Sequence, residues 1–179
     1  MLMLGRDWKN GNREFLLLNN TIILGEDILN KLTDLEKKIG FEFDDEDLLN
    51  QAFVHSSYLN EHNELNQCNE RLEFLGDAVL ELVVTEHMYE NLIGQEGELH
   101  KERVKFVKND YLSEIANNLR LDNFLMKGNG ESNNEDGINT RTSNVLEALI
   151  GAIFLDGKET GYQKAKEFVL KHVILNPNV

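Results

Sequence analysis

The sequence predicts an all-α fold. Its 179 residues include a single proline and 13 glycines, and 41% of them are hydrophobic, which is enough for a sizeable core. Long segments repeat their apolar residues at spacings of three and four, the period of an amphipathic helix. A strand protein of this size would instead show many short alternating runs between turn residues. We therefore expect one globular domain that is mostly helical.

Residues 1–26 are the segment whose structure the sequence defines least, and we interpret them as an N-terminal extension. Turn signals at 10–11 and 19–20 flank the short apolar runs 15–18 and 21–24. This pattern is consistent with a small hairpin or an ordered arm.

Helices are predicted along the rest of the chain, from residue 27 to residue 175, before a short tail at 176–179. Gly40 is placed to end the first helix, and Asp44 and Asp45 suit the positive end of the second. The predicted helices are 27–38, 44–53, 69–92, 99–107, 111–119, 144–155 and 161–175. The polar segments 54–69 and 128–143 are predicted to be connections.

The formal net charge of −14 limits how this chain could bind nucleic acid. Proteins that bind nucleic acid through bulk electrostatics are usually basic, because they gain affinity by releasing counterions from the phosphates. If the substrate is nucleic acid, binding has to come from a local basic patch, from bound cations, or from a separate RNA-binding partner or region.

The sequence favours an intracellular, cytoplasmic protein, with the nucleus or an organelle as compatible alternatives. Its one cysteine, Cys68, cannot form an intramolecular disulfide, and the N-terminus does not combine a basic start with an apolar run and a cleavage site. No apolar run approaches the roughly 20 residues that span a bilayer. We therefore expect no membrane partner.

Four carboxylates share one face of the predicted helix 69–92. Spacings of three and four place them there: Glu70, Glu73, Asp77 and Glu81. Like charges one turn apart repel each other, so a cation must offset the repulsion, or solvent must do so on an exposed face. The spacing alone leaves both interpretations open for Glu73 and Asp77.

Glu147 is an anomaly in the predicted helix 144–155, because its neighbours are almost all apolar. A helix that is apolar on every side lies in the interior. A carboxylate buried there is normally neutralised, paired with a cation or bound to a metal. Its partner could be a buried arginine such as Arg71, or a metal shared with Asn144, three residues earlier on the same face.

A metal site follows if the two helices face each other. Four oxygen-bearing side chains would then converge: Glu73, Asp77, Asn144 and Glu147. Such a group suits a hard cation such as Mg²⁺, which supports phosphodiester hydrolysis. His55 could add a ligand or a general base, but its neighbouring serines favour a hydrogen-bonded structural histidine.

These segments resemble the ribonuclease III family of double-stranded-RNA endonucleases. The stretch NERLEFLGDAVLEL at 69–82 closely resembles the signature motif of that family. Four further blocks lie in the family's order and spacing: LLNQAFVHSSYLNE at 48–61, EGELHKERVKFVKNDYLSEIANNLRL at 96–121, FLMKGNGE at 124–131 and NVLEALIGAIFLD at 144–156. Five colinear blocks make a coincidence improbable.

The resemblance implies an all-helical, RNase III-like nuclease domain over 27–175 that works as a homodimer. Each subunit would cut one strand of double-stranded RNA at a Mg²⁺-dependent centre, with Mn²⁺ as a substitute, and would leave short 3′ overhangs. The metal ligands would be Glu73, Asp77 and Glu147. Glu70 and Glu96 lie where the family has accessory acidic residues.

Two surface assignments accompany the resemblance. Phe74 matches a residue that the family uses at the dimer contact, and a core position is its alternative because aromatic residues at helical spacing are usually core. The richest basic cluster is Lys101, Arg103, Lys105 and Lys108. It could bind RNA phosphates weakly, or it could be an ordinary solvated helix face.

The chain departs from the family's pattern at Asn144, where the family normally has aspartate. One negative charge is lost from the expected metal site, and metal affinity should fall with ligand charge. An amide oxygen can still coordinate Mg²⁺ or hold its water. We expect a working centre that demands more metal.

A second departure is length. Typical bacterial members continue into a separate, basic domain that binds double-stranded RNA by its shape. No such domain is expected within these residues, so RNA binding should be weak and strongly salt-sensitive.

Two other functions compete with nuclease activity. A non-catalytic RNase III-like RNA-binding or scaffolding subunit would explain Asn144, although Glu73, Asp77 and Glu147 are all retained. An all-α nucleotide pyrophosphatase also binds Mg²⁺ with helical carboxylate pairs, but it would not explain the five colinear blocks.

Overall fold

The computed structural model describes residues 3–6, 14–18, 21–24, 26–62, 67–129 and 135–175. For residues up to 31, and for 135–136, it describes the backbone alone. The predicted tail at 176–179, the turns at 10–11 and 19–20, and part of the predicted connection 128–143 lie outside the described residues.

A small antiparallel sheet precedes the helices. It contains β1 (Met3–Arg6), β2 (Glu14–Leu18) and β3 (Thr21–Leu24) in that order. In the pair β2–β3, Phe15 lies opposite Leu24, and Leu18 lies opposite Thr21. The expected hairpin therefore forms, and β1 extends it by one strand. The division into an extension at 1–26, a domain at 27–175 and a tail stays a prediction.

Helices make up most of the remainder of the described chain, as the sequence predicts. The helices are α1 (Glu26–Ile39), α2 (Glu46–Ala52), α3 (Ser56–Glu61), α4 (Glu70–Asn91), α5 (Glu96–Val107), α6 (Asn109–Asn118), α7 (Glu135–Asp156) and α8 (Gly161–Val169). Two short 3₁₀ turns, η1 (Leu121–Asn123) and η2 (Lys158–Thr160), connect them, and a π-helical segment, η3 (Leu170–Leu175), continues α8. Among the described residues, no helix combines the length and the hydropathy that crossing a membrane requires.

The segment 54–69 is not wholly a connection, because α3 lies within it. His55 is the N-cap of α3, and its side chain accepts a hydrogen bond from the Ser57 backbone N–H. Tyr58 is the one buried residue of this helix, so the segment lacks the apolar period that sequence analysis detects. The capping contact supports the structural interpretation of His55.

The predicted connection 128–143 is also too long, because α7 begins at Glu135. The early residues of α7 are polar and follow a glycine-rich stretch, which is the pattern typical of a loop. Thr142 and Ser143 instead bond to the carbonyls of the preceding turn, at Ile138 and Thr140 respectively, while the helix continues through them.

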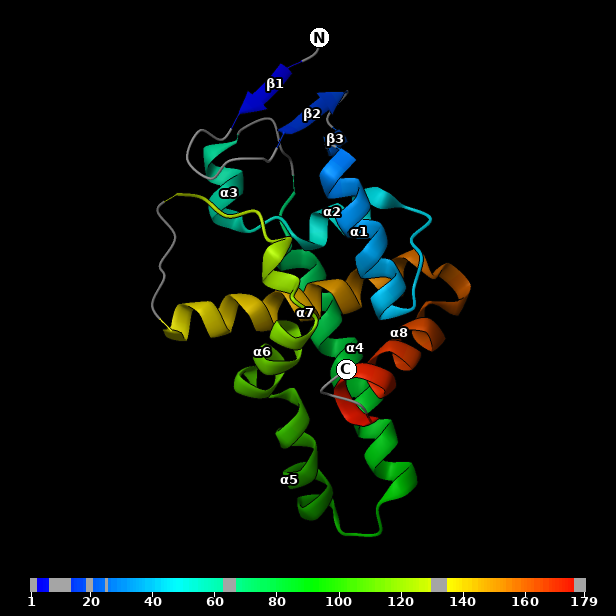
Figure 1. The fold of residues 1–179 in the computed structure, drawn as a ribbon. Coiled ribbons are helices and arrows are strands. Elements are labelled where there is room, and N and C mark those ends of the chain that lie inside the picture. The colour runs from blue at the N-terminus through cyan, green and yellow to red at the C-terminus, as the bar shows by residue number, and fades with distance from the viewer. Residues whose placement is uncertain are drawn as a thin grey trace.

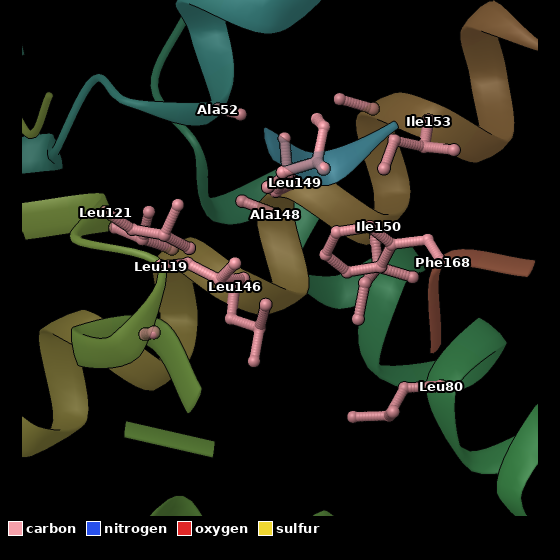
Figure 2. Packing of buried hydrophobic residues seen from close by; sticks show 14 of the residues in the cluster. Ala52, Leu80, Leu119, Leu121, Leu146, Ala148, Leu149, Ile150, Ile153 and Phe168 are labelled. Atoms are coloured by element: carbon pink, nitrogen blue, oxygen red, sulfur yellow. The ribbon is translucent and has the colours of Figure 1, made fainter. Parts of the chain in front are cut away.

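The hydrophobic core is built around α7, which crosses the middle of the molecule beside α4 (Figure 1). Residues on several sides of α7 are buried, as expected for a helix that is apolar all round. Figure 2 shows Leu146, Leu149, Ile150 and Ile153 of α7 among the packed side chains, with Leu80 of α4 and Phe168 of α8. This packing fixes α4 and α7 relative to each other.

Candidate active site

The backbones of α4 and α7 touch at two glycines. A Cβ atom added to Gly76 would lie 1.7 Å from the carbonyl oxygen of Glu147, and one added to Gly151 would lie 2.2 Å from the carbonyl oxygen of Leu72. Side-chain atoms cannot be accommodated at such separations, so this crossing requires glycine at both positions. Glu147 is thereby held against the turn of α4 that carries Glu73 and Asp77.

Glu147 is buried at this crossing, with 8% of its surface exposed. The charges that act on it are those of Asp77 and Glu73. Arg71, the alternative partner that the sequence suggested, is exposed, and no ion pair joins it to Glu147 within the described chain. The structure therefore places Glu147 beside other carboxylates and not beside a guanidinium.

The carboxylates at the crossing have raised pKa values, because their negative charges lie close together and are not compensated by a cation. Burial, then the charges of Asp77 and Glu73, raise the pKa of Glu147 to about 8. Burial and the charge of Glu70 raise the pKa of Glu73, with a smaller contribution from Asp77, and a hydrogen bond from Asn144 partly opposes them. Burial and the charge of Glu81 raise the pKa of Asp77. A bound cation would favour the ionised form of each carboxylate.

The fit of this group to a divalent cation can be judged from its donors. Three carboxylates and one amide oxygen are the donors that Mg²⁺ and Mn²⁺ take in proteins. Nevertheless, no three His, Cys, Asp or Glu side chains in the described part of the chain are arranged as a set that could hold a metal ion. The donor types and the raised carboxylate pKa values fit a cation, whereas the ligand atoms are not gathered around one point.

The two accessory acidic residues lie in different settings. Glu70 begins α4, is exposed, and raises the pKa of Glu73 by its charge. Glu96 is exposed at the first residue of α5 and is not among the groups that shift the pKa of Glu73, Asp77 or Glu147. The structure thus brings Glu70 to the group at the α4–α7 crossing and leaves Glu96 on a separate helix.

Phe74 is 81% exposed on α4, so its alternative assignment to the core is wrong. Leu82 and Tyr89 on the same helix are also exposed, at 55% and 78%. We call these three exposed residues the apolar surface of α4, and exposed apolar side chains of this size are typical of a protein–protein contact.

The basic cluster on α5 is partly neutralised by its own neighbours. The side chain of Arg103 is 27% exposed, and its Nη1 lies 3.6 Å from Glu81 Oε2 and 3.4 Å from Thr85 Oγ1 on α4. Lys105 pairs with Glu102 at 2.6 Å. Lys101 and Lys108 are exposed. Arg103 therefore joins α5 to α4. Lys105 is exposed but already paired, so Lys101 and Lys108 are better placed to meet phosphates.

Sequence reasoning missed the two glycines that position the site. Gly76 and Gly151 each interrupt a helical pattern. Glycine lowers the stability of a helix interior, so a glycine found there often marks a close approach of two backbones. That signal was present in the sequence. The ion pair between Arg103 and Glu81 has no comparable signal, because it depends on how α5 packs against α4.

Residues 45–177 match the family model described as Ribonuclease-III-like, so the chain belongs to that family. It is 42% identical over 143 residues to Ribonuclease 3 of Borreliella burgdorferi, covering 78% of this chain and 57% of the relative. It is 43% identical over 143 residues to Ribonuclease 3 of Enterococcus faecalis, covering 77% of this chain and 61% of the relative. The chain thus spans somewhat more than half the length of these relatives.

The fold is similar to a solved nuclease domain as well. The chain matches the nuclease domain of ribonuclease III from Campylobacter jejuni with a TM-score of 0.71 and 37% identity. That solved structure shows structural flexibility in a region involved in dimer formation. The match covers 82% of this chain and 97% of that one. The expected RNase III-like helical fold is confirmed.

Proposed function

We propose that this chain is a metal-dependent endoribonuclease that cleaves double-stranded RNA as a homodimer, with each subunit hydrolysing one strand to leave 3′ overhangs. One observation carries the proposal: Glu147 is buried against Gly76, within the electrostatic reach of Glu73 and Asp77, and has no cationic side chain among the groups that shift its pKa. The chain's membership of the Ribonuclease-III-like family supports hydrolysis of RNA phosphodiesters as the reaction class.

Glu73, Asp77 and Glu147 would hold the cation, with Asn144 completing the group. Mg²⁺ is the proposed ion, and Mn²⁺ should substitute because it accepts the same oxygen donors. When bound, the ion activates water and offsets the charge that develops on the scissile phosphate. The carboxylates repel one another, and a bound cation would relieve that repulsion. The negative charge of the group therefore favours cation binding.

The homodimer would form across the apolar surface on α4 that includes Phe74. This places the contact on the helix that carries Glu73 and Asp77, so the two centres of a dimer would have a fixed relation to each other. The solved Campylobacter jejuni domain, whose description refers to dimer formation, supports this assignment.

RNA would bind through the cations of the two centres and through a small number of exposed basic residues, Lys101 and Lys108 foremost. The net charge of −14 opposes binding everywhere else. A separate RNA-binding partner or region would raise the affinity for RNA. The reducing, intracellular setting expected from Cys68 is compatible with an RNA substrate.

A non-catalytic RNase III-like subunit is the second candidate, and Asn144 is the observation that favours it. In this candidate the chain binds RNA or scaffolds a partner without cutting. Retention of three neighbouring carboxylates at the crossing, with Glu147 buried, opposes it, because like charges that raise one another's pKa are unfavourable for stability and serve no purpose in a scaffold.

The decisive experiment incubates the protein with labelled duplex RNA, and separately with nucleoside triphosphates, with and without Mg²⁺ or Mn²⁺. We expect cleavage of the duplex only, dependent on the cation, and abolished by Glu147→Gln. The matched control is Glu90→Gln, which changes an exposed acidic residue of α4. Intact RNA under all conditions would favour the non-catalytic subunit, and triphosphate hydrolysis would favour a pyrophosphatase.

A further inference from the structure

A pocket of about 140 Å³ lies where the end of α1 meets α8 and η3 (Figure 1). Residues 39–41 line one side of it, and Lys164, Glu167, Phe168 and Lys171 line the other. None of these residues belongs to the α4–α7 crossing. The pocket is therefore separate from the candidate active site.

A buried histidine ties the two sides of the pocket together. His172 of η3 is buried, and its Nε2 lies 3.1 Å from the carbonyl oxygen of Ile39, where α1 ends. A carbonyl oxygen can only accept, so Nε2 donates this hydrogen bond. The ring of His172 also packs against that of Phe168, with 4.9 Å between the ring centroids. These contacts hold the pocket in a preformed shape.

Gly40 leaves the space that the Lys171 ammonium occupies. Its φ of +77° lies in the left-handed region, which favours glycine. A Cβ atom added to Gly40 would lie 3.2 Å from Lys171 Nζ. The ammonium thus lies over the end of α1, where the negative end of the helix dipole favours a cation.

Two ammonium groups at the pocket lack a carboxylate partner. Lys164 and Lys171 are exposed, and neither forms an ion pair within the part of the chain that the structure describes. Glu167, a carboxylate of the same lining, accepts a hydrogen bond from Gln163 at 3.2 Å. The two ammonium groups are therefore free to bind an anion from solution.

Further positive charge surrounds the pocket. Burial and the charge of Arg120 lower the pKa of Lys38, whose Nζ donates to the Asn118 carbonyl at 2.7 Å. Burial lowers the pKa of His172, and the charges of Lys171 and Lys38 lower it further, against the opposing effect of its hydrogen bond. In a chain with a net charge of −14, this region is locally basic and attracts anions.

The pocket also has room for a flat ring. Phe41, which is half-buried, and Phe168, which is buried, contribute aromatic side chains to its lining. A cavity of about 150 Å³ accepts one benzene-sized ring. The pocket is of nearly this volume, and aromatic side chains favour a flat ring by stacking. The Glu167 carboxylate can accept hydrogen bonds from N–H groups at the edge of such a ring.

We propose that this pocket binds a pyrimidine nucleotide, with its ring against Phe41 and Phe168 and its phosphate at Lys164 and Lys171. A nucleotide combines the three features that the lining requires, which are a flat ring, N–H donors at its edge and an anion. The proposal is independent of the nuclease reaction. A free mononucleotide and the terminal nucleotide of an RNA strand carry the same chemistry, and the experiment distinguishes them.

Titration with cytidine 5′-monophosphate, followed by nuclear magnetic resonance, tests the proposal. A chelator is present, so the phosphate cannot bind through a cation at the α4–α7 crossing. We expect saturable binding with a dissociation constant below about 1 mM. The amide signal of Gly40 should shift, and that of Gly97 on α5 should not. Absence of saturable binding, or a Gly40 signal that does not shift, would overturn the proposal.

Lys164→Ala and Lys171→Ala should each weaken binding of this nucleotide by about fivefold, because each removes an ammonium from the phosphate. The matched control is Lys37→Ala on α1, which removes an exposed lysine that pairs with Asp34 and lies outside the lining. It should change the affinity by about twofold or less. Equal effects of the three substitutions would show bulk electrostatic attraction and overturn the pocket.

Ribose 5-phosphate separates the ring from the phosphate, because it lacks a base. The unmodified protein should bind it at least about fivefold more weakly than cytidine 5′-monophosphate. Phe41→Leu should remove most of this difference by weakening binding of the nucleotide alone. Equal affinity of the unmodified protein for the two ligands would overturn the place given to the ring, whether or not Phe41→Leu folds.

A single-stranded oligoribonucleotide that begins with a 5′-phosphorylated cytidine distinguishes the two sources of the nucleotide. Binding that is tighter than that of cytidine 5′-monophosphate and is weakened by Lys171→Ala supports the end of an RNA strand. Any other result, with the mononucleotide still bound, supports the free nucleotide. Neither titration requires a cation or cleavage, so failure of the pocket and failure of the proposed nuclease are observed separately.

Discussion

At the scale of single residues, Glu147 links the stability of the protein to its proposed chemistry. Burial and two neighbouring carboxylates raise its pKa to about 8 from an ordinary value of 4.5. Between these pH values the unfolded chain has released the proton and the folded chain still binds it. Stability therefore falls as the pH rises from about 4.5 to about 8, by an amount on the order of a few kcal/mol.

Substituting Glu147→Gln should remove this loss. The neutral amide has the shape of the protonated acid, so the two proteins should be about equally stable near pH 4.5. At pH 8 the variant should be more stable, by roughly 1–3 kcal/mol, while losing cleavage. Urea unfolding across this pH range, with a chelator present, measures the difference. A difference that does not change with pH would contradict the raised pKa, and Glu90→Gln is the control that should show none.

Cation binding should release protons, because a carboxylate ligand must be deprotonated. At pH 7 a group with a pKa of about 8 is mostly protonated, so binding of Mg²⁺ or Mn²⁺ should release close to one proton from Glu147. The release should diminish above pH 9. Calorimetry in buffers of different ionisation enthalpy counts these protons, and Glu147→Gln should abolish the contribution. Binding without proton release at pH 7 would place the cation elsewhere.

The residues of the candidate site could be proposed from the sequence, but their contacts could not. Glu147 was recognisable because a carboxylate within an apolar helix needs a partner, and Glu73 and Asp77 because their spacing puts like charges on one face. The pairing of Arg103 with Glu81, for example, depends on how two helices pack against each other. No spacing within one helix specifies that.

At the scale of elements, the crossing of α4 and α7 depends on glycine. The close contacts at Gly76 and Gly151 leave no room for a methyl group. The same crossing brings carboxylates of two helices together, so packing and the proposed chemistry share one structural requirement. Repulsion between the carboxylates opposes the crossing, and the buried apolar side chains of α7 stabilise it.

Gly76→Ala should separate the helices. The added methyl group would lie 1.7 Å from the Glu147 carbonyl oxygen, so the backbones must move apart. We expect a loss of at least about 1–3 kcal/mol of stability, and a loss of cation-dependent cleavage of tenfold or more in the protein that still folds. The control is Gly97→Ala on α5, where a Cβ atom would meet nothing within 4 Å. Thermal unfolding should show that control unchanged or slightly stabilised, and equal effects at the two glycines would contradict the argument.

The boundaries of the elements were less predictable than the elements themselves. The long apolar helices α4 and α7 were identified from their period, whereas α3 and the first turns of α7 were assigned to connections. Both missed segments are polar, and contacts made elsewhere stabilise them. Glu61 at the end of α3, for example, accepts hydrogen bonds from the backbone and the side chain of Asn129, at 2.8 Å and 2.9 Å.

At the scale of the whole molecule, the net charge should govern binding of RNA, and the apolar surface of α4 should govern dimerisation. An acidic protein repels RNA unless cations and a few basic side chains compensate. Binding of duplex RNA in Ca²⁺, used as a cation that should not support rapid cleavage, should therefore weaken steeply with salt. Lys101→Ala should weaken it more than Lys105→Ala, because Lys105 already pairs with Glu102. Equal effects in an electrophoretic binding assay would contradict this distinction.

Phe74 provides the clearest test of the assembly. It is 81% exposed, so Phe74→Ala removes little buried surface from a single subunit and should leave the folding of that subunit nearly unchanged. If this aromatic side chain is central to the dimer contact, its loss should raise the dimer dissociation constant by tenfold or more. Analytical ultracentrifugation over a range of protein concentrations measures the constant, and unfolding of the dilute, monomeric protein provides the control. Because each subunit would cut one strand, cleavage of both strands of a duplex should fall in parallel with dimerisation and recover at high protein concentration. A variant that stays dimeric, or a monomer that cuts both strands equally well, would show that the apolar surface of α4 serves another purpose.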